Sequence, residues 1–213
     1  RDEGDSTVIL YSLEYTAREV RILDFSKVEV VQMKILAIQA SPRKKGNTNR
    51  VLDEMIKGCE DKGHEVIKYY VNGLDINPCS GCEICAKGKD CRFDDDGAEI
   101  INQLAEGAGI IIASPIYFGQ MTAQAKTVID RFYSIFNNPD KKFNGKAAMI
   151  FTHAFPDKDI YEPYIKLTEA QPFMNNTELE YIETLEVAGV KFIGDADKAE
   201  EDLKKAYEIG QKF

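Results

Sequence analysis

The sequence predicts an α/β domain in which a parallel sheet is covered by helices on both faces. Short apolar runs such as 33–40 and 108–115 are continuous, which is typical of strands buried on both faces. These runs alternate with amphipathic stretches of helical length, and strands that alternate with helices form parallel sheets. Such sheets bind ligands beyond the carboxyl ends of their strands, so we expect a site at that edge.

The first half of the domain contains three predicted strands and two predicted helices. Strand 33–40 is a continuous apolar run, and helix 48–63 carries apolar side chains at helical spacing and ends at Gly63. Strand 64–71 follows. Helix 94–107 begins with acidic residues, which the positive end of the helix dipole favours, and strand 108–115 is again apolar throughout.

The second half repeats the pattern. Pro163 and Pro172 limit one of its helices, because proline breaks the hydrogen-bond ladder of a helix interior. The last helix is amphipathic and reaches the end of the chain. The predicted elements are a helix at 121–136, a strand at 146–153, a helix at 159–174, a strand at 180–194 and a helix at 195–213.

Residues 1–32 do not follow this alternation of strands and helices. Two of their segments, 6–15 and 18–31, alternate apolar and polar residues as β-strands do. We therefore predict a short β-rich N-terminal extension over 1–32, which is either a hairpin or added edge strand or a stretch upstream of the domain. A single domain of five parallel strands is predicted over 33–213.

Composition excludes several classes of function. The net charge is −9, and no basic cluster is longer than the short run at 43–45, which argues against a nucleic acid partner. No apolar run approaches the roughly 20 residues that cross a bilayer, and the first residues do not resemble a secretory signal. We expect a cytoplasmic protein that binds no membrane.

The loop after the first strand, 40–50, combines short polar side chains with a glycine at the start of a helix. Unpaired backbone N–H groups at a helix start form a natural anion site. The same residue types are also ordinary turn and cap residues, so the loop alone fits either reading. It matches neither the dinucleotide-binding nor the nucleotide triphosphate glycine motif. The polar side chains belong to Ser41, Asn47, Thr48 and Asn49, and the glycine is Gly46.

The loop after the third strand, 114–126, lies beside the first loop in either common strand order. Tyr117 and Phe118 supply aromatic surface there, and Gly119 allows the backbone to approach a flat ligand. The alternative is that the two aromatic residues pack into the core. Together, the two loops suit a ligand with an anionic end and a planar ring.

Four of the five cysteines fall within the segment 78–92, at Cys79, Cys82, Cys85 and Cys91. A disulfide, a zinc site, an iron–sulfur cluster and free thiols are the alternatives, and a reducing cytoplasm disfavours the disulfide. Zinc sites commonly use two separated C-x2-C pairs, whereas compact runs sharing a cysteine are typical of iron–sulfur proteins. The spacing therefore favours a [4Fe–4S] cluster. Cys59, on the apolar face of a helix, is interpreted as a buried small hydrophobe.

The segments "SPRKKGNT", "SPIYFGQMTAQAK" and "DRF" resemble the NAD(P)H-dependent FMN reductase and flavodoxin-like superfamily. The segment "CSGCEICAKGKDC" between them resembles its iron–sulfur flavoprotein branch. The resemblance covers about 33–213. It implies a flavodoxin-like three-layer sandwich with strand order 2-1-3-4-5, and bound FMN together with a [4Fe–4S] cluster.

The resemblance also implies site residues. Ser41, Arg43, Asn47, Thr48 and Asn49 would hold the FMN phosphate, and Pro115, Ile116, Tyr117, Phe118 and Gly119 would line the ring. Lys126, Asp130 and Arg131 match the family's helix, where we expect structural ion pairs rather than catalysis.

This chain departs from the family pattern at two places. Ala40 stands where glycine is common before Ser-Pro, and the loop 152–159 contains no glycine. In that loop His153 is expected to be structural.

The function that follows is electron transfer between a ferredoxin or NAD(P)H donor and a small-molecule or protein acceptor, in a homodimer or homotetramer. One alternative is an NAD(P)H-dependent FMN or quinone reductase without a cluster. Another is a zinc-clipped flavodoxin-like binding module that performs no catalysis.

Overall fold

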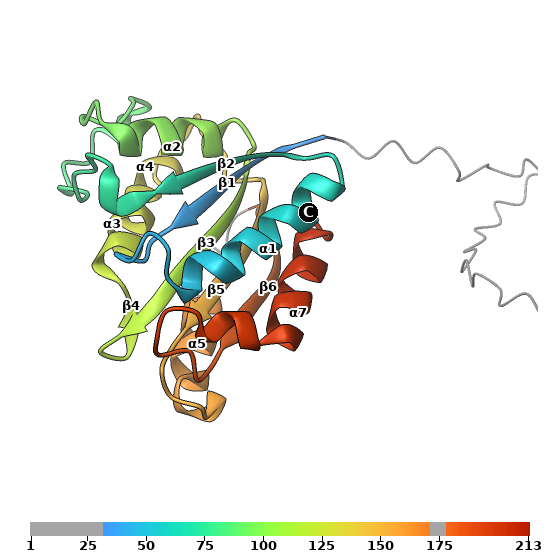
Figure 1. Cartoon of the computed structure of the whole chain (residues 1–213). Helices are drawn as coiled ribbons and strands as arrows, with labels where there is room; N and C mark the ends of the chain where they lie inside the picture. The colour runs from blue at the N-terminus through green and yellow to red at the C-terminus, as the bar shows by residue number, and fades with distance from the viewer. Residues whose placement is uncertain (1–31, 171–177) are drawn as a thin grey trace, which may run out of the picture. The chain divides into compact units, whose positions relative to one another are not determined.

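A computed structural model describes residues 32–170 and 178–213 (Figure 1). All but the last residue of the predicted extension 1–32 lies outside the described residues. In the described part of the chain, no helix is long and apolar enough to cross a membrane.

The sheet has the predicted parallel core. Its parallel strands lie in the order β2-β1-β3-β5-β6, which is 2-1-3-4-5 when the parallel strands are counted along the chain. A two-residue strand, β4, was not predicted and pairs antiparallel with β3. The strands are β1 (Lys34–Gln39), β2 (Glu65–Tyr70), β3 (Gly109–Tyr117), β4 (Gln120–Met121), β5 (Lys146–Thr152) and β6 (Glu180–Val187).

Helices cover both faces of the sheet and form the three predicted layers (Figure 1). Successive side chains of a strand point to opposite faces, so Ile110 of β3 packs in one apolar cluster and Ile111 in the other. This explains why the strands are continuously apolar in sequence. One face is covered by α1 (Asn47–Asp61) and α7 (Glu200–Gly210), and the other by α2 (Asp96–Ala105), α3 (Ala123–Arg131), α4 (Tyr133–Phe136) and α5 (Glu162–Glu169).

Helix α1 ends where the sequence predicts, in a glycine-dependent turn. Gly63 has φ +88°, and its N–H donates to the carbonyl of Glu60 at 2.8 Å. The N–H of His64 donates to the carbonyl of Cys59 at 3.2 Å. These two bonds form a Schellman motif, which satisfies carbonyls that would otherwise be unpaired at the helix end.

Helices α1 and α7 lie side by side at very close range (Figure 1). A Cβ atom built on Gly58 would come 2.2 Å from the carbonyl oxygen of Tyr207. A Cβ atom on Gly210 would come 2.1 Å from the carbonyl oxygen of Met55. The contact therefore depends on two glycines that face each other's helix backbone.

We expect Gly58→Ala to destabilise the protein by about 3 kcal/mol, because backbone atoms cannot move aside as a flexible side chain can and the helices must separate. Urea unfolding followed by far-UV circular dichroism measures the loss. Glu60→Ala, an exposed change in the same helix, should alter the free energy of unfolding by less than about 0.5 kcal/mol. Equal stability of Gly58→Ala and the wild type would contradict this packing.

The predicted helix at 121–136 is wrong at its start and in its middle. Met121 pairs with Ile116 in the antiparallel strand, and the helix begins only after Thr122, whose hydroxyl accepts from the N–H of Ala125. The helix then ends at Arg131, and α4 begins at Tyr133.

Two other predicted elements are too long. The helix predicted at 159–174 is a 3₁₀ turn, Lys158–Ile160, followed by α5, and its last residues lie outside the described part of the chain. The strand predicted at 180–194 ends at Val187, after which Gly189 turns the chain with φ +76°.

Candidate functional site

A cavity of about 260 Å³ lies at the carboxyl edge of the sheet, where the sequence predicted a site. It is lined by the loop after β1 with the start of α1, by the ends of β3 and β5, and by the loops that follow β5 and β6. Seven of the predicted ligand residues line it, namely Ser41, Arg43, Asn47, Thr48, Pro115, Ile116 and Tyr117. Asn49, Phe118 and Gly119 are outside its lining.

The start of α1 faces this cavity without a side-chain cap. The N-cap residue, Gly46, has an extended backbone and no side chain to accept from the first N–H groups of the helix. The hydroxyl of Ser41 accepts from the N–H of Arg43 at 3.1 Å, and the N–H of Gly46 donates to the carbonyl of Arg43 at 3.0 Å. The loop is thus fixed by its own bonds. The helix N-terminus, with its partial positive charge, remains available to an anion.

The side chain of Asn47 has a structural role that the sequence did not reveal. Its amide nitrogen donates to the carbonyls of Val190 and Phe192, at 3.2 and 2.8 Å. Its amide oxygen accepts from the N–H groups of Gly194 and Ala196, both at 3.2 Å. All four hydrogen-bonding positions of the amide are therefore used to hold the loop after β6 against the start of α1.

Thr48 and Asn49 point in different directions. The hydroxyl of Thr48 is buried and lies 2.7 Å from the hydroxyl of Thr152, so it joins α1 to the end of β5 in the cavity wall. The side chain of Asn49 instead donates to the carboxylate of Asp53 at 2.7 Å, along the exposed surface of the helix.

The second loop is a tight hairpin between β3 and β4. Tyr117 pairs with Gln120, and the two residues between them, Phe118 and Gly119, have φ +50° and +83°. Two positive φ values in a two-residue loop are the requirement of a type I′ turn, and a non-glycine residue there carries strain. The side chain of Phe118 is fully exposed. The alternative that both aromatic residues pack into the core is therefore wrong for Phe118, and Tyr117 is 43% exposed.

Buried hydroxyls hold this hairpin against the first loop. The hydroxyl of Thr122 donates to the carbonyl of Ala40 at 2.8 Å, and the N–H of Thr122 donates to the hydroxyl of Ser114 at 3.0 Å. The ends of β1 and β3 are therefore fixed relative to each other, which sets the width of the cavity between them.

The glycine-free loop after β5 forms the opposite wall, through Thr152, His153 and Ala154. The Nε2 atom of His153 donates to Glu186 at 2.9 Å, and its ring lies edge-on to Tyr161 with centroids 4.8 Å apart. These contacts confirm that His153 has a structural role. Its buried Nδ1 atom has no hydrogen-bond partner among the described residues.

The four clustered cysteines line one small cavity of about 20 Å³. Cys85 is buried, Cys91 is half-buried, and Cys79 and Cys82 are exposed. The backbone turns between them at Gly81 and Gly88, with φ +64° and +71°. Within the described residues, no three metal-binding side chains are already arranged around the position of a single ion. Cys59 lies in the core, and burial raises the pKa of its thiol to about 12.

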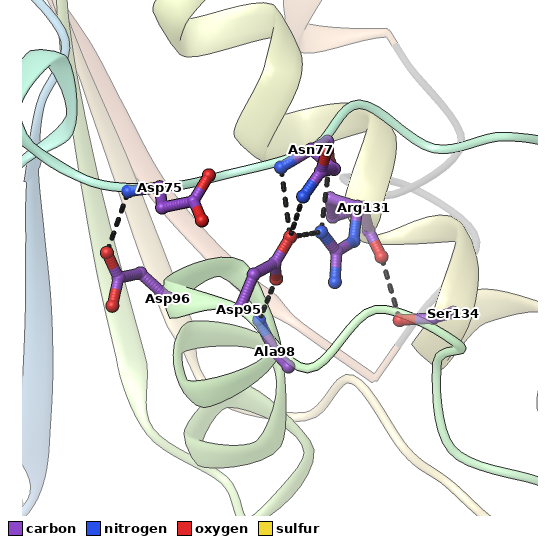
Figure 2. Close-up of polar contacts among 7 residues, drawn as sticks. All are labelled: Asp75, Asn77, Asp95, Asp96, Ala98, Arg131 and Ser134. Atoms are coloured by element: carbon purple, nitrogen blue, oxygen red, sulfur yellow. Dashed lines mark hydrogen bonds and ion pairs between the residues drawn. The ribbon is translucent and has the colours of Figure 1, made fainter.

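The ends of the cysteine segment are joined by a buried ion pair (Figure 2). The Nη1 atom of Arg131 donates to the carboxylate of Asp95 at 2.8 Å and to the carbonyl of Asn77 at 2.9 Å. The carboxylate also accepts from the N–H groups of Asn77 and Ala98. Because Asn77 precedes the cysteines and Asp95 follows them, Arg131 holds both ends of the segment against α3. This is the expected structural ion pair, and Lys126 and Asp130 form another on the helix surface.

The two cavities lie at opposite ends of α3. The helix begins one residue after β4, beside the first cavity, and ends at Arg131, which lines the second. Its nine residues correspond to about 13 Å. The cysteine segment leaves the carboxyl edge of the sheet after β2, but the sulfur-lined cavity lies further along α3, at Arg131.

Sequence reasoning missed several lining residues of the first cavity, including Val190 and Lys191. They follow β6. The predicted strand extended to residue 194, so these residues were assigned to the strand and not to a loop at the site. The order of the strands was the available signal, because every parallel strand delivers a loop to the same edge.

Comparison with known proteins identifies the family and supports the fold. Residues 33–157 match the model of the family described as NADPH-dependent FMN reductase. A protein of Archaeoglobus fulgidus named iron–sulfur flavoprotein is 32% identical over 189 residues, which cover 85% of this chain and 79% of that protein. Another protein of the same name and organism is 39% identical over 115 residues, 54% of this chain and 58% of the relative. This chain thus spans just over half the length of the second relative.

A solved structure extends the similarity in fold. An NAD(P)H:quinone oxidoreductase from Methanothermobacter marburgensis superposes with a TM-score of 0.67 over 85% of this chain and 96% of that one, at 15% identity. The chain belongs to the iron–sulfur flavoprotein branch of the NADPH-dependent FMN reductase family, and it is a flavin-dependent oxidoreductase.

Proposed function

We propose that this protein binds FMN in the cavity at the carboxyl edge and a [4Fe–4S] cluster on its four clustered cysteines. It would pass electrons between a ferredoxin or NAD(P)H donor and a small-molecule or protein acceptor. The observation that carries the proposal is the convergence of four cysteines on one cavity, in a chain that also has a cavity with an uncapped helix start at the carboxyl edge of its sheet.

The FMN phosphate would be held at the start of α1. Free N–H groups in the first helical turn supply donors, and Ser41, Arg43 and Thr48 lie in the same wall. The guanidinium of Arg43 is exposed at this wall and supplies a positive charge. Asn47 would contribute its backbone N–H, since its side chain is fully engaged. Asn49 would contribute only backbone, because its side chain binds Asp53.

The flavin ring would lie between two walls of the same cavity. One wall is the chain 115–117, with Phe118 and Gly119 at the hairpin tip, and the other is the loop after β5. The unpaired Nδ1 atom of His153 belongs to this second wall and is a polar group that a ring atom can satisfy. These residues would orient the ring and exclude water from one side of it.

The cysteine cavity fits a cluster by the chemistry of its donors. Thiolates are the ligands of iron–sulfur clusters. The cavity is smaller than a cluster, so the exposed residues Cys79 and Cys82 would have to shift outward to admit one. The pKa of Cys82 is lowered, chiefly because the N–H of Ile84 donates to its sulfur, which favours the thiolate.

When bound, a flavin accepts electrons in pairs and a cluster exchanges them singly, so together they couple two-electron and one-electron partners. The residues described above bind and orient these groups. We also propose that the chain forms a homodimer or homotetramer. Apolar side chains are exposed at the hairpin tip, at Phe118, and in a further cavity of about 460 Å³ that Phe136 lines together with Cys79.

The test is the composition of the full chain purified without oxygen. FMN with about four irons and four sulfides per chain is expected. FMN without iron would instead support the reductase that lacks a cluster, and zinc without flavin would support the binding module.

A pair of cysteine variants sharpens this test. Cys85→Ala is expected to lose most of the iron, because this sulfur lines the cavity. Cys59→Ala should keep all of it, since Cys59 packs in the core against other helices and strands. Full iron content in Cys85→Ala would contradict the assigned ligands.

A further inference from the structure

Arg131 has donors that the ion pair does not use. Its guanidinium is only 1% exposed, and Nη1 alone accounts for the bonds to Asp95 and Asn77 (Figure 2). The buried Nε and Nη2 atoms have no hydrogen-bond partner among the described residues. Unsatisfied buried donors are rare and call for an explanation, such as a group that completes the site.

The surroundings of the guanidinium show what such a group must be. Arg131 lines the same small cavity as Cys79, Cys82, Cys85 and Cys91. The ring of Phe93 lies against the guanidinium, with its centroid 5.2 Å from Cζ, and shields it from water. A buried cation with spare donors therefore faces a sulfur-lined space.

We propose that Arg131 is a positioning residue for the iron–sulfur cluster, to which it donates hydrogen bonds from Nε and Nη2 and beside which it holds a fixed positive charge. The acceptors would be cluster sulfur atoms or the Cys91 thiolate. This inference rests on the proposed function, since it requires that the four cysteines hold a cluster.

The consequence is a higher reduction potential of the cluster. Reduction adds one negative charge, and hydrogen bonds to sulfur and nearby positive charge stabilise the more negative state. The effect is large in a site shielded from water, because charges interact more strongly at low dielectric. Arginine suits this role because its guanidinium remains charged at all ordinary pH values.

The ion pair with Asp95 limits how far Arg131 raises the reduction potential of the cluster. Asp95 neutralises part of the guanidinium charge, and its side chain is only 3% exposed. Removal of the carboxylate charge should therefore raise the reduction potential of the cluster, whereas removal of the guanidinium should lower it. A residue that only held the fold together would not produce opposite signs.

The experiment is an anaerobic redox titration of the full, cluster-containing protein, followed by the electron paramagnetic resonance signal of the reduced cluster. Arg131→Gln is expected to lower the reduction equilibrium constant at least tenfold, which is about 59 mV for one electron. Asp95→Asn is expected to raise it. Lys126→Gln removes a positive charge from the exposed face of the same helix and should shift it less than twofold.

Iron content and melting temperature are measured first for every variant. If Arg131→Gln does not retain the cluster, Asp95→Asn decides alone: a higher potential supports the proposal, and an unchanged or lower one overturns it. Equal potentials in cluster-loaded Arg131→Gln and the wild type also overturn it, while the proposed function stands. A wild type without iron overturns both.

Discussion

Asp95→Ala is expected to destabilise the cluster-free protein by about 3–5 kcal/mol. The change leaves the guanidinium of Arg131 buried without its counter-charge, and it also removes the acceptor for Asn77 and the cap of α2. Loss of one partner of a buried ion pair is costly because the remaining charge cannot return to water. Urea unfolding of the cluster-free protein measures the difference.

Asp96→Ala is the matched control. Asp96 is the neighbouring acid at the start of the same helix, and it accepts from the N–H of Asp75 at the surface (Figure 2). Its loss should cost about 1 kcal/mol or less, because water replaces the carboxylate. Similar losses of unfolding free energy in both variants would show that the buried pair contributes no more to stability than the carboxylate at the surface.

The same ion pair gives the stability a defined pH dependence. Burial raises the pKa of Asp95, but the donors of Arg131 and Asn77 outweigh this and lower it to about 2. An unfolded aspartate titrates near 3.9, so the folded state holds this carboxylate charged at lower pH. The stabilisation is complete above about pH 4 and is lost as the pH falls through about 2. The difference between the wild type and Asp95→Ala should shrink by about 2 kcal/mol over that range.

Features of the sequence that repeat along the chain predicted the fold well. Continuous apolar strands alternating with helices indicated the parallel sheet, and the strand order then followed from the family resemblance. The late start of α3 was not predictable from apolar spacing, because it depends on the pairing of Met121 with Ile116 in a hairpin outside the helix.

Side-chain roles that depend on distant parts of the chain were the least predictable. The sequence places Asn47 in a polar loop suited to an anion, but its amide binds residues that lie 143 to 149 positions later. Likewise, the spacing of the cysteines indicates a cluster, whereas the approach of Arg131 to them depends on how α3 packs. Residue type and local pattern therefore located the sites, and the tertiary structure decided which atoms are free to act.

Asn47→Asp is expected to weaken FMN binding at least about a hundredfold, or about 2.7 kcal/mol. A carboxylate cannot donate to the carbonyls of Val190 and Phe192, so those bonds are replaced by repulsion between oxygens. The loop after β6 would leave the start of α1, and a negative charge would stand beside the phosphate site. Isothermal titration of the flavin-free protein with FMN measures the change.

Asn49→Asp makes the same chemical change two residues along the same helix. Its side chain points toward Asp53 and away from the cavity, so FMN affinity should change less than about threefold. Both substitutions place an acid in the first turn of α1, where the helix dipole favours it equally, so this contribution cancels in the comparison. If the two variants lost affinity equally, net charge rather than the Asn47 contacts would control binding. If neither lost it, FMN would not bind at this end of α1.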